Sequence, residues 1–181
     1  MPYRLSCTGH RPNKLGGYNT NPVASYVYKW LSVQAVRALI QHEDVEFISG
    51  MAIGVDTIFA AIALKAKQLY PDRVHLLCAV PFETHSSNWP TPSVKYYDKL
   101  LSKADEIVMV SKGGFTPQKM QARNEFMVDR CDELLAVWDG ETVGGTWNCV
   151  KYAREKEKKI TYIDQKRLKT YQQIEERLRK G

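Results

Sequence analysis

The stretch Glu46–Ala60, EFISGMAIGVDTIFA, decides the fold that this chain is expected to adopt. Its apolar start leads into Ser49 and Gly50, and Gly54 and Asp56 follow just before a long helical pattern. A strand, a glycine turn and a helix start leave backbone N–H groups without an intrahelical partner, and the helix dipole favours negative charge there. This order predicts a site for a phosphate or another anion. The alternative is an ordinary strand-to-helix turn with Asp56 as a capping residue.

Apolar strand-like runs and helical patterns alternate on both sides of this stretch. The expected strands cover residues 3–8, 45–49, 74–80, 106–110, 133–138 and 160–163. The expected helices cover residues 22–42, 57–70, 95–103, 118–130, 147–156 and 166–179. This alternation predicts one α/β domain over residues 1–181, with a mostly parallel sheet and helices on both faces. In the first helix the expected apolar stripe comprises Val27, Leu31, Val36, Leu39 and Ile40.

Three loops follow expected strands, where open α/β sheets bind ligands. The loop at residues 9–17 carries His10, Arg11 and Lys14, and we expect a binding role for it in preference to a plain surface connection. The loop at residues 81–90 contains Phe82 and Trp89, which either stack on a base or cover the core. The third loop, at residues 139–146, is a second glycine turn before a helix.

Composition limits the class of protein. The chain has 181 residues, of which 44% are hydrophobic and 25% charged, as in globular proteins that fold in water. No apolar run has the length of a membrane span or of a secretory signal, so a cytoplasmic protein with no membrane partner is expected. The four cysteines are far apart and none forms a Cys-x-x-Cys pair, which favours buried reduced thiols over a metal or redox site.

The positive charge is confined to one end of the chain. Residues 151–181 hold 11 Lys and Arg against 5 Asp and Glu, whereas residues 1–150 hold 15 of each. A basic groove across the whole sheet is therefore not expected. The C-terminal segment predicts a basic amphipathic helix at about residues 165–180, with nucleic acid as an unfavoured but open partner. We expect this helix to dock through Leu168, Tyr171, Ile174 and Leu178.

Four motifs in order carry a family resemblance. They are Thr8–Arg11 (TGHR), Ser49–Asp56 (SGMAIGVD), Arg123–Met127 (RNEFM) and Gly144–Thr146 (GGT). Together they resemble the SLOG superfamily of Rossmann-like proteins, most closely its YpsA-like branch of uncharacterised bacterial and phage proteins. The resemblance covers about residues 3–163 and implies a Rossmann-like fold. The second motif is similar to the DNA-processing branch, and the third and fourth are similar to the lonely-guy phosphoribohydrolases.

The resemblance implies three functions. In the superfamily, phosphoribohydrolases cut the N-glycosidic bond of nucleoside monophosphates, DNA-processing proteins load a recombinase onto single strands, and sensor domains are thought to bind nucleotide-derived signals. The phosphoribohydrolases carry a glutamate after their Gly-Thr, whereas here Thr146 precedes Trp147 and Asn148. Because glycoside cleavage relies on carboxylates, this departure counts against hydrolysis.

The first expected function is therefore binding or sensing of a nucleotide-derived, phosphate-bearing ligand. The alternatives are a nucleoside monophosphate N-glycosidase, with Arg123 and Glu125 as catalytic candidates, and single-stranded nucleic-acid binding. A homodimer is expected because the phosphoribohydrolases form dimers, and neither a metal nor a cofactor is expected. The expected ligand-binding residues are Gly9, His10, Arg11, Ser49, Gly50, Gly54, Asp56, Arg123, Gly144, Gly145, Thr146 and Asn148.

Two of these residues have structural alternatives. Arg123 suits phosphate as a charge-assisted donor, but a surface salt bridge with Glu125 or Asp129 on its own helix is the other reading. His10 either positions a ligand or is a loop histidine satisfied by the backbone.

Overall fold

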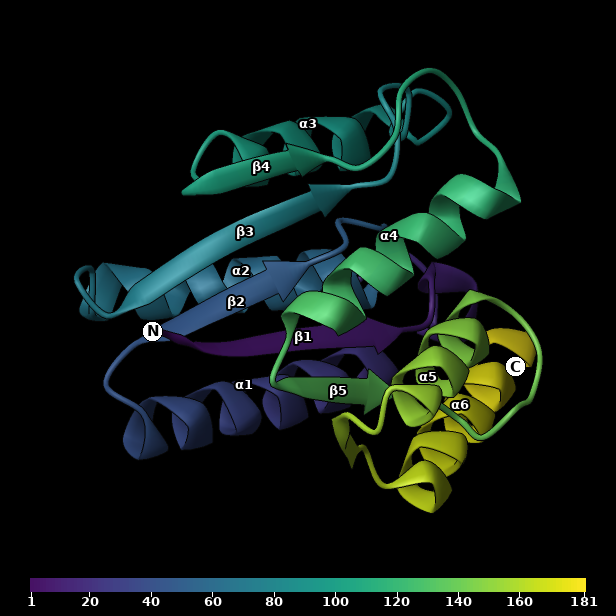
Figure 1. Ribbon diagram of the computed structural model, residues 1–181. Coiled ribbons are helices and arrows are strands. Elements are labelled where there is room, and N and C mark those ends of the chain that lie inside the picture. The colour runs from purple at the N-terminus through teal and green to yellow at the C-terminus, as the bar shows by residue number, and fades with distance from the viewer.

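A six-stranded, all-parallel sheet forms the centre of the molecule in a computed structural model that describes all 181 residues (Figure 1). The strands are β1 (Tyr3–Gly9), β2 (Val45–Ser49), β3 (Val74–Val80), β4 (Glu106–Met109), β5 (Glu133–Val137) and β6 (Lys159–Tyr162). Their order across the sheet is β4-β3-β2-β1-β5-β6, and every neighbouring pair is parallel. The expected α/β, Rossmann-like architecture is confirmed.

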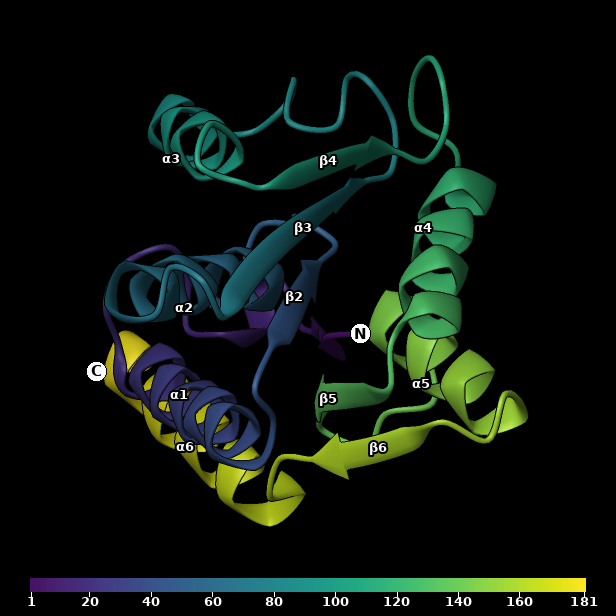
Figure 2. The same cartoon turned by 60° about the vertical axis from the view of Figure 1, so that its left-hand side comes forward.

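Helices cover both faces of the sheet. They are α1 (Pro22–Gln41), α2 (Val55–Leu69), α3 (Thr91–Leu101), α4 (Pro117–Arg130), α5 (Gly145–Glu155) and α6 (Gln165–Lys180), with a short 3-10 turn at Pro12–Lys14. Helices α1 and α2 lie on one face, with α6 packed on α1, and α4 and α5 lie together on the other face (Figure 2). None of the helices combines the length and apolar character that crossing a bilayer requires.

Alternate residues of the strands supply two apolar cores. Leu5, Phe47 and Leu76 point to the α1–α2 side, whereas Ile48 and Leu77 point to the α4–α5 side. Strands buried on both faces explain the nearly continuous apolar runs in the sequence.

The strand order reverses between β1 and β5. From β1 the chain proceeds outward through β2, β3 and β4, and α4 then returns it to β5 on the other side of β1. The connections that leave the carboxyl ends of β1 and β5 therefore diverge and leave a crevice, which is the usual ligand position in open α/β sheets.

In two helices, α1 and α6, some of the apolar residues predicted to face the core are exposed. In α1 the side chains of Val36 and Ile40 are 55% and 79% exposed, so their assignment to the core stripe is wrong. The smaller Ala35 and Ala38 take those places against the protein interior. In α6 Leu168 is buried and Tyr171 stacks on Tyr26 of α1, with ring centroids 4.8 Å apart.

Two of the four apolar residues expected to dock α6 lie on its exposed side. Ile174 and Leu178 are 42% and 65% exposed, so the predicted docking face is correct only for Leu168 and Tyr171. The Lys and Arg side chains of α6 are all exposed.

Leu168→Ala is expected to lower the free energy of unfolding by about 2–5 kcal/mol, because it leaves a cavity between α6 and α1. Leu178→Ala removes the same atoms from an exposed position, and its effect should stay within about 0.5 kcal/mol. Urea denaturation followed by circular dichroism measures both. Equal effects of the two substitutions would show that α6 does not dock as described.

Candidate functional site

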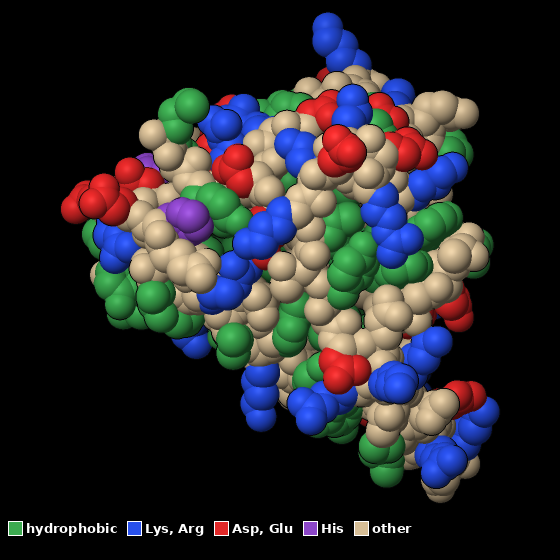
Figure 3. All heavy atoms as spheres, turned by 60° about the horizontal axis from the view of Figure 1, so that its bottom comes forward, with side chains coloured by type: hydrophobic (Ala, Val, Ile, Leu, Met, Phe, Trp, Pro, Cys, Tyr) green, Lys and Arg blue, Asp and Glu red, His purple; other side chains and the backbone are tan.

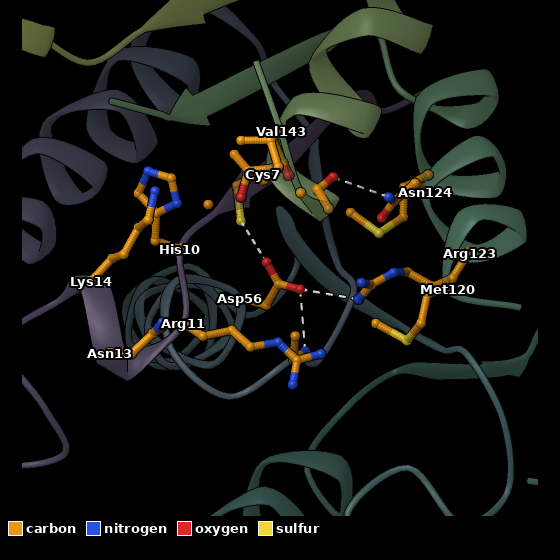
Figure 4. A pocket seen from close by; sticks show the side chains of 17 residues that line it. Cys7, His10, Arg11, Asn13, Lys14, Asp56, Met120, Arg123, Asn124 and Val143 are labelled. Carbon is orange, nitrogen blue, oxygen red and sulfur yellow. Dashed lines mark hydrogen bonds and ion pairs between the residues drawn. The ribbon is translucent and has the colours of Figure 1, made fainter. Parts of the chain in front are cut away.

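A cavity of about 220 Å³ lies in the crevice between the carboxyl ends of β1 and β5 (Figure 4). It is bounded by the end of β1 and the loop after it, the starts of α2 and α5, and one side of α4. Its lining residues are Cys7, Thr8, Gly9, His10, Arg11, Asn13, Lys14, Ala52, Asp56, Met120, Arg123, Asn124, Met127, Val143, Gly144, Gly145 and Thr146.

Four N–H groups at the turn before α2 find acceptors within the protein. Ala52 N–H donates to Asp56 Oδ2 at 3.2 Å, and Val55 N–H donates to the carbonyl of His10 at 3.3 Å. The N–H groups of Met51 and Gly54 donate to the hydroxyls of Ser49 and Thr57. The expectation of bare N–H donors is wrong for these four groups, whereas the N–H groups of Ile53, Asp56 and Thr57 have no acceptor in the structure. The Asp56 carboxylate thus serves as an internal acceptor for the Ala52 N–H.

Arg123 is buried beside Asp56 and joins α4 to the α2 turn. Its Nη1 donates to Asp56 Oδ2 at 3.1 Å and to the carbonyl of Gly50, and the residue is 5% exposed. The reading of Arg123 as a surface salt bridge on its own helix is therefore wrong. Its buried Nε has no hydrogen-bond partner and its Nη2 makes no hydrogen bond either, so the guanidinium of this cavity-lining residue keeps uncommitted donors.

Gly50 is required by this arrangement. A Cβ at this position would lie 2.1 Å from Nη1 of Arg123 and 2.8 Å from Oδ2 of Asp56. The glycine of the sequence motif thus makes room for an internal guanidinium, and the residue does not line the cavity.

Two buried acids on the cavity wall hold protons more tightly than usual. Burial raises the pKa of the Asp56 carboxyl, although Arg123 and the Ala52 N–H oppose the shift. Burial and the nearby Asp56 raise the pKa of the Cys7 thiol well above its ordinary value, and its Sγ lies 3.9 Å from Asp56 Oδ1. Cys7 is therefore a neutral wall residue, because only a thiolate is a strong nucleophile.

His10 and Lys14 join the loop after β1 to the loop after β5. His10 Nε2 accepts the N–H of Asp139 at 3.2 Å, and burial lowers the pKa of His10, so its ring is neutral. Lys14 Nζ lies 3.0 Å from Asp139 Oδ2 and 2.5 Å from Glu141 Oε2. Arg11 is different: it is exposed at the cavity and makes neither an ion pair nor a side-chain hydrogen bond.

The start of α5 is open to the cavity. Gly144 caps this helix with a positive φ of 92°, and the first intrahelical donor is Asn148, which bonds the carbonyl of Gly144. The N–H groups of Gly145, Thr146 and Trp147 come before it and have no acceptor in the structure. A Cβ added at Gly144 or Gly145 would meet nothing within 4 Å, so there is room for a ligand here.

The cavity gathers most of the residues expected to bind a ligand. Gly9, His10, Arg11, Asp56, Arg123, Gly144, Gly145 and Thr146 line it. Ser49, Gly50 and Gly54 lie in the turn behind Asp56, and Asn148 and Glu125 line a separate hollow on the outer surface of α4 and α5. The two glycine turns therefore meet on the same side of the sheet, but of their glycines only Gly144 and Gly145 line the cavity.

Three further residues of α4 form part of the cavity wall and were not identified from the sequence. Met120, Asn124 and Met127 face the cavity from α4 together with Arg123. Arg123, Asn124 and Met127 follow Met120 by three, four and seven positions, a spacing that places all four residues on one side of a helix. This stripe was the signal that could have found them, whereas nothing in the sequence singled out Cys7 or Val143.

The chain belongs to the YspA SLOG family, whose model YpsA matches residues 5–171. It is 33% identical over 132 residues to the uncharacterised SPbeta prophage-derived protein YoqJ of Bacillus subtilis, covering 66% of this chain and 76% of that protein. It is 29% identical over 154 residues to a UPF0398 protein of Bacillus cereus, covering 84% and 83% of the two chains.

Two solved structures share the fold. DNA processing protein A of Streptococcus pneumoniae superposes with a TM-score of 0.62 at 16% identity, and that of Helicobacter pylori with 0.60 at 17% identity. Each superposition covers 89% of this chain, but only 50% and 65% of the respective neighbours, which are thus longer proteins. At these identities the likeness concerns the fold alone.

Gly50→Ala is expected to lower the free energy of unfolding by about 1–3 kcal/mol, because the added methyl collides with Arg123 and Asp56. Gly145→Ala, at the open start of α5, should leave stability within about 0.5 kcal/mol. Urea denaturation of the two variants beside the wild type is the measurement. A Gly50→Ala protein as stable as the wild type would contradict the close packing around Arg123.

Proposed function

We propose that the protein binds a nucleotide-derived ligand and holds its phosphate at the start of α5. The observation that carries this proposal is the set of uncommitted donors around one cavity. These are the free N–H groups of Gly145 and Thr146, the unpaired Arg11 side chain and the uncommitted Nη2 group of Arg123. Donors without partners at a helix start favour an anion, and guanidinium groups suit phosphate.

Charge supports an anionic ligand. Lys14 is paired with Asp139 and Glu141, and Asp56 is paired with Arg123, so Arg11 remains as the unpaired charge on the wall.

The remaining wall supports a ligand larger than phosphate. Met120, Met127 and Val143 provide an apolar part, and Asn124 donates to the carbonyl of Gly145 at 3.4 Å, which leaves its own amide oxygen free. Such a mixture of apolar surface and a few polar groups is usual for small-molecule sites. Membership of the SLOG family makes a nucleotide the first choice of ligand.

Hydrolysis of the N-glycosidic bond is not favoured. Glu125 lines a hollow outside the cavity, and Asp139 is engaged by Lys14 and by the N–H of Glu141. Asp56 is the one carboxylate among the residues that line the cavity, and it is held by Arg123 and Ala52. A carboxylate free to face a sugar cation is what this chemistry needs.

Single-stranded DNA binding is the second candidate, because the Helicobacter pylori neighbour is described by its single-stranded DNA binding mode. A continuous basic groove would favour it. On the face shown in Figure 3, however, Lys and Arg side chains are scattered among Asp, Glu and uncharged side chains. Because residues 1–150 also hold equal numbers of basic and acidic residues, we place a mononucleotide-sized ligand before a polynucleotide.

Arg11→Ala is expected to weaken binding of the best nucleoside monophosphate by about tenfold or more, because a hydrogen bond to a charged group contributes about 1.5–3 kcal/mol. Arg177→Ala is the matched control, since it removes an exposed arginine from α6, outside the cavity. Thermal shift across AMP, CMP, GMP and UMP selects the ligand, and calorimetry gives the affinities of both variants.

Chromatography of the same mixtures for free base distinguishes binding from hydrolysis. The proposal expects binding with no turnover. Equal affinities of the Arg11→Ala and Arg177→Ala proteins would contradict the site, and robust release of base would establish the hydrolase instead.

A further inference from the structure

A second hollow lies beside the first, on the other side of the turn that follows β1. Its volume is about 460 Å³, within the range of small-molecule sites. Pro12 and Leu15 of this turn line the second hollow, whereas Asn13 and Lys14 line the first. The remaining wall comes from residues 17–20, Ala24 of α1, the turn before α2 with the start of that helix, Trp89 and the start of α3.

The wall of this hollow carries no charge. None of its 14 lining residues is Lys, Arg, Asp, Glu or His, although charged residues make up 25% of the chain. The first cavity is lined by two arginines, a lysine and an aspartate. A charged ligand entering the second hollow would lose solvation without gaining an ion pair, so the hollow favours an uncharged ligand.

Three aromatic rings surround the hollow. Tyr18 is 65% exposed and Tyr96 is 46% exposed, and they belong to separate segments of the chain. The ring of Trp89 makes T-shaped contacts with the rings of His85 and Tyr97, whose centroids lie 4.9 and 5.2 Å from its own. Exposed rings around a concave wall offer stacking surfaces to a planar ligand.

Uncommitted polar groups complete the wall. The side chains of Asn19, Thr20 and Ser93 line the hollow and make no hydrogen bond within the protein. They supply donors and acceptors for the edge of a planar heterocycle, whose faces the aromatic rings contact.

We propose that this second hollow binds an uncharged planar heterocycle of the nucleobase or nucleoside class, at a site distinct from the phosphate site. The uncharged wall favours a neutral ligand, and the aromatic rings favour a planar one. The free polar side chains favour a ligand with hydrogen-bonding groups along its edge. This inference does not depend on the proposed function, because no residue lines both hollows.

The probe is adenosine, which carries no phosphate, and saturation-transfer NMR titrations measure its affinity. Tyr18→Ala and Tyr96→Ala should each weaken adenosine binding at least about fivefold, as expected for loss of one stacking partner. Tyr70→Ala is the matched control, because Tyr70 is 45% exposed and lies outside the hollow. It should bind adenosine like the wild type, and ribose alone should not bind.

Circular dichroism confirms that each variant is folded, and the Arg11→Ala protein separates the two sites. If the Arg11→Ala protein still binds adenosine, the result supports a second site. This holds even if neither that protein nor the wild type binds a nucleoside monophosphate, which would count only against the proposed function. The proposal is overturned if the wild type does not bind adenosine or if the Tyr18 and Tyr96 variants bind it like the Tyr70 variant. It is also overturned if Arg11→Ala alone abolishes binding, because adenosine then occupies the first cavity.

Discussion

The buried pair of Arg123 and Asp56 is the interaction on which the arrangement at the carboxyl edge of the sheet depends. It joins α4, on one face of the sheet, to the start of α2, on the other, at the point where the strand order reverses. Removing one partner of a buried pair leaves an uncompensated charge, which typically costs about 3–5 kcal/mol. The carbonyl of Gly50 and the N–H of Ala52 hold the pair in place, so the glycine-rich motif before α2 serves the interior of the protein.

The internal hydrogen bonds of the turn before α2 favour the start of α5 as the proposed ligand site. At α2 the chain's own carboxylate accepts the Ala52 N–H, whereas at α5 the N–H groups of Gly145 and Thr146 face an open cavity. Both helices begin after a glycine with positive φ, at Gly54 and Gly144. The two helix starts differ at the second residue after the glycine. At α2 this residue is Asp56, which has a carboxylate, whereas at α5 it is Thr146, which has none. The proposed nucleotide site follows from this difference.

The sequence was sufficient for the strands and for the parallel sheet, because buried parallel strands form uninterrupted apolar runs bounded by polar loops. It also located His10, Arg11, Arg123 and the Gly144–Thr146 turn at one edge of the sheet. It could not show that Arg123 turns inward to Asp56, because two residues 67 positions apart meet only through the crossing of α4. Likewise the exposure of Val36 and Ile40 depends on which side of α1 meets the sheet, and apolar residues occur on both sides of this helix.

The central claim is that a ligand phosphate binds the free N–H groups of α5 and not those of the α2 turn. Two-dimensional amide NMR of the isotope-labelled protein, titrated with the best nucleoside monophosphate, tests it directly. The account predicts that the amide signals of Gly145 and Thr146 shift most, while those of Ala52 and Val55, already bonded within the protein, move little. Large shifts at Ala52 and Val55 with unchanged signals at Gly145 and Thr146 would contradict it.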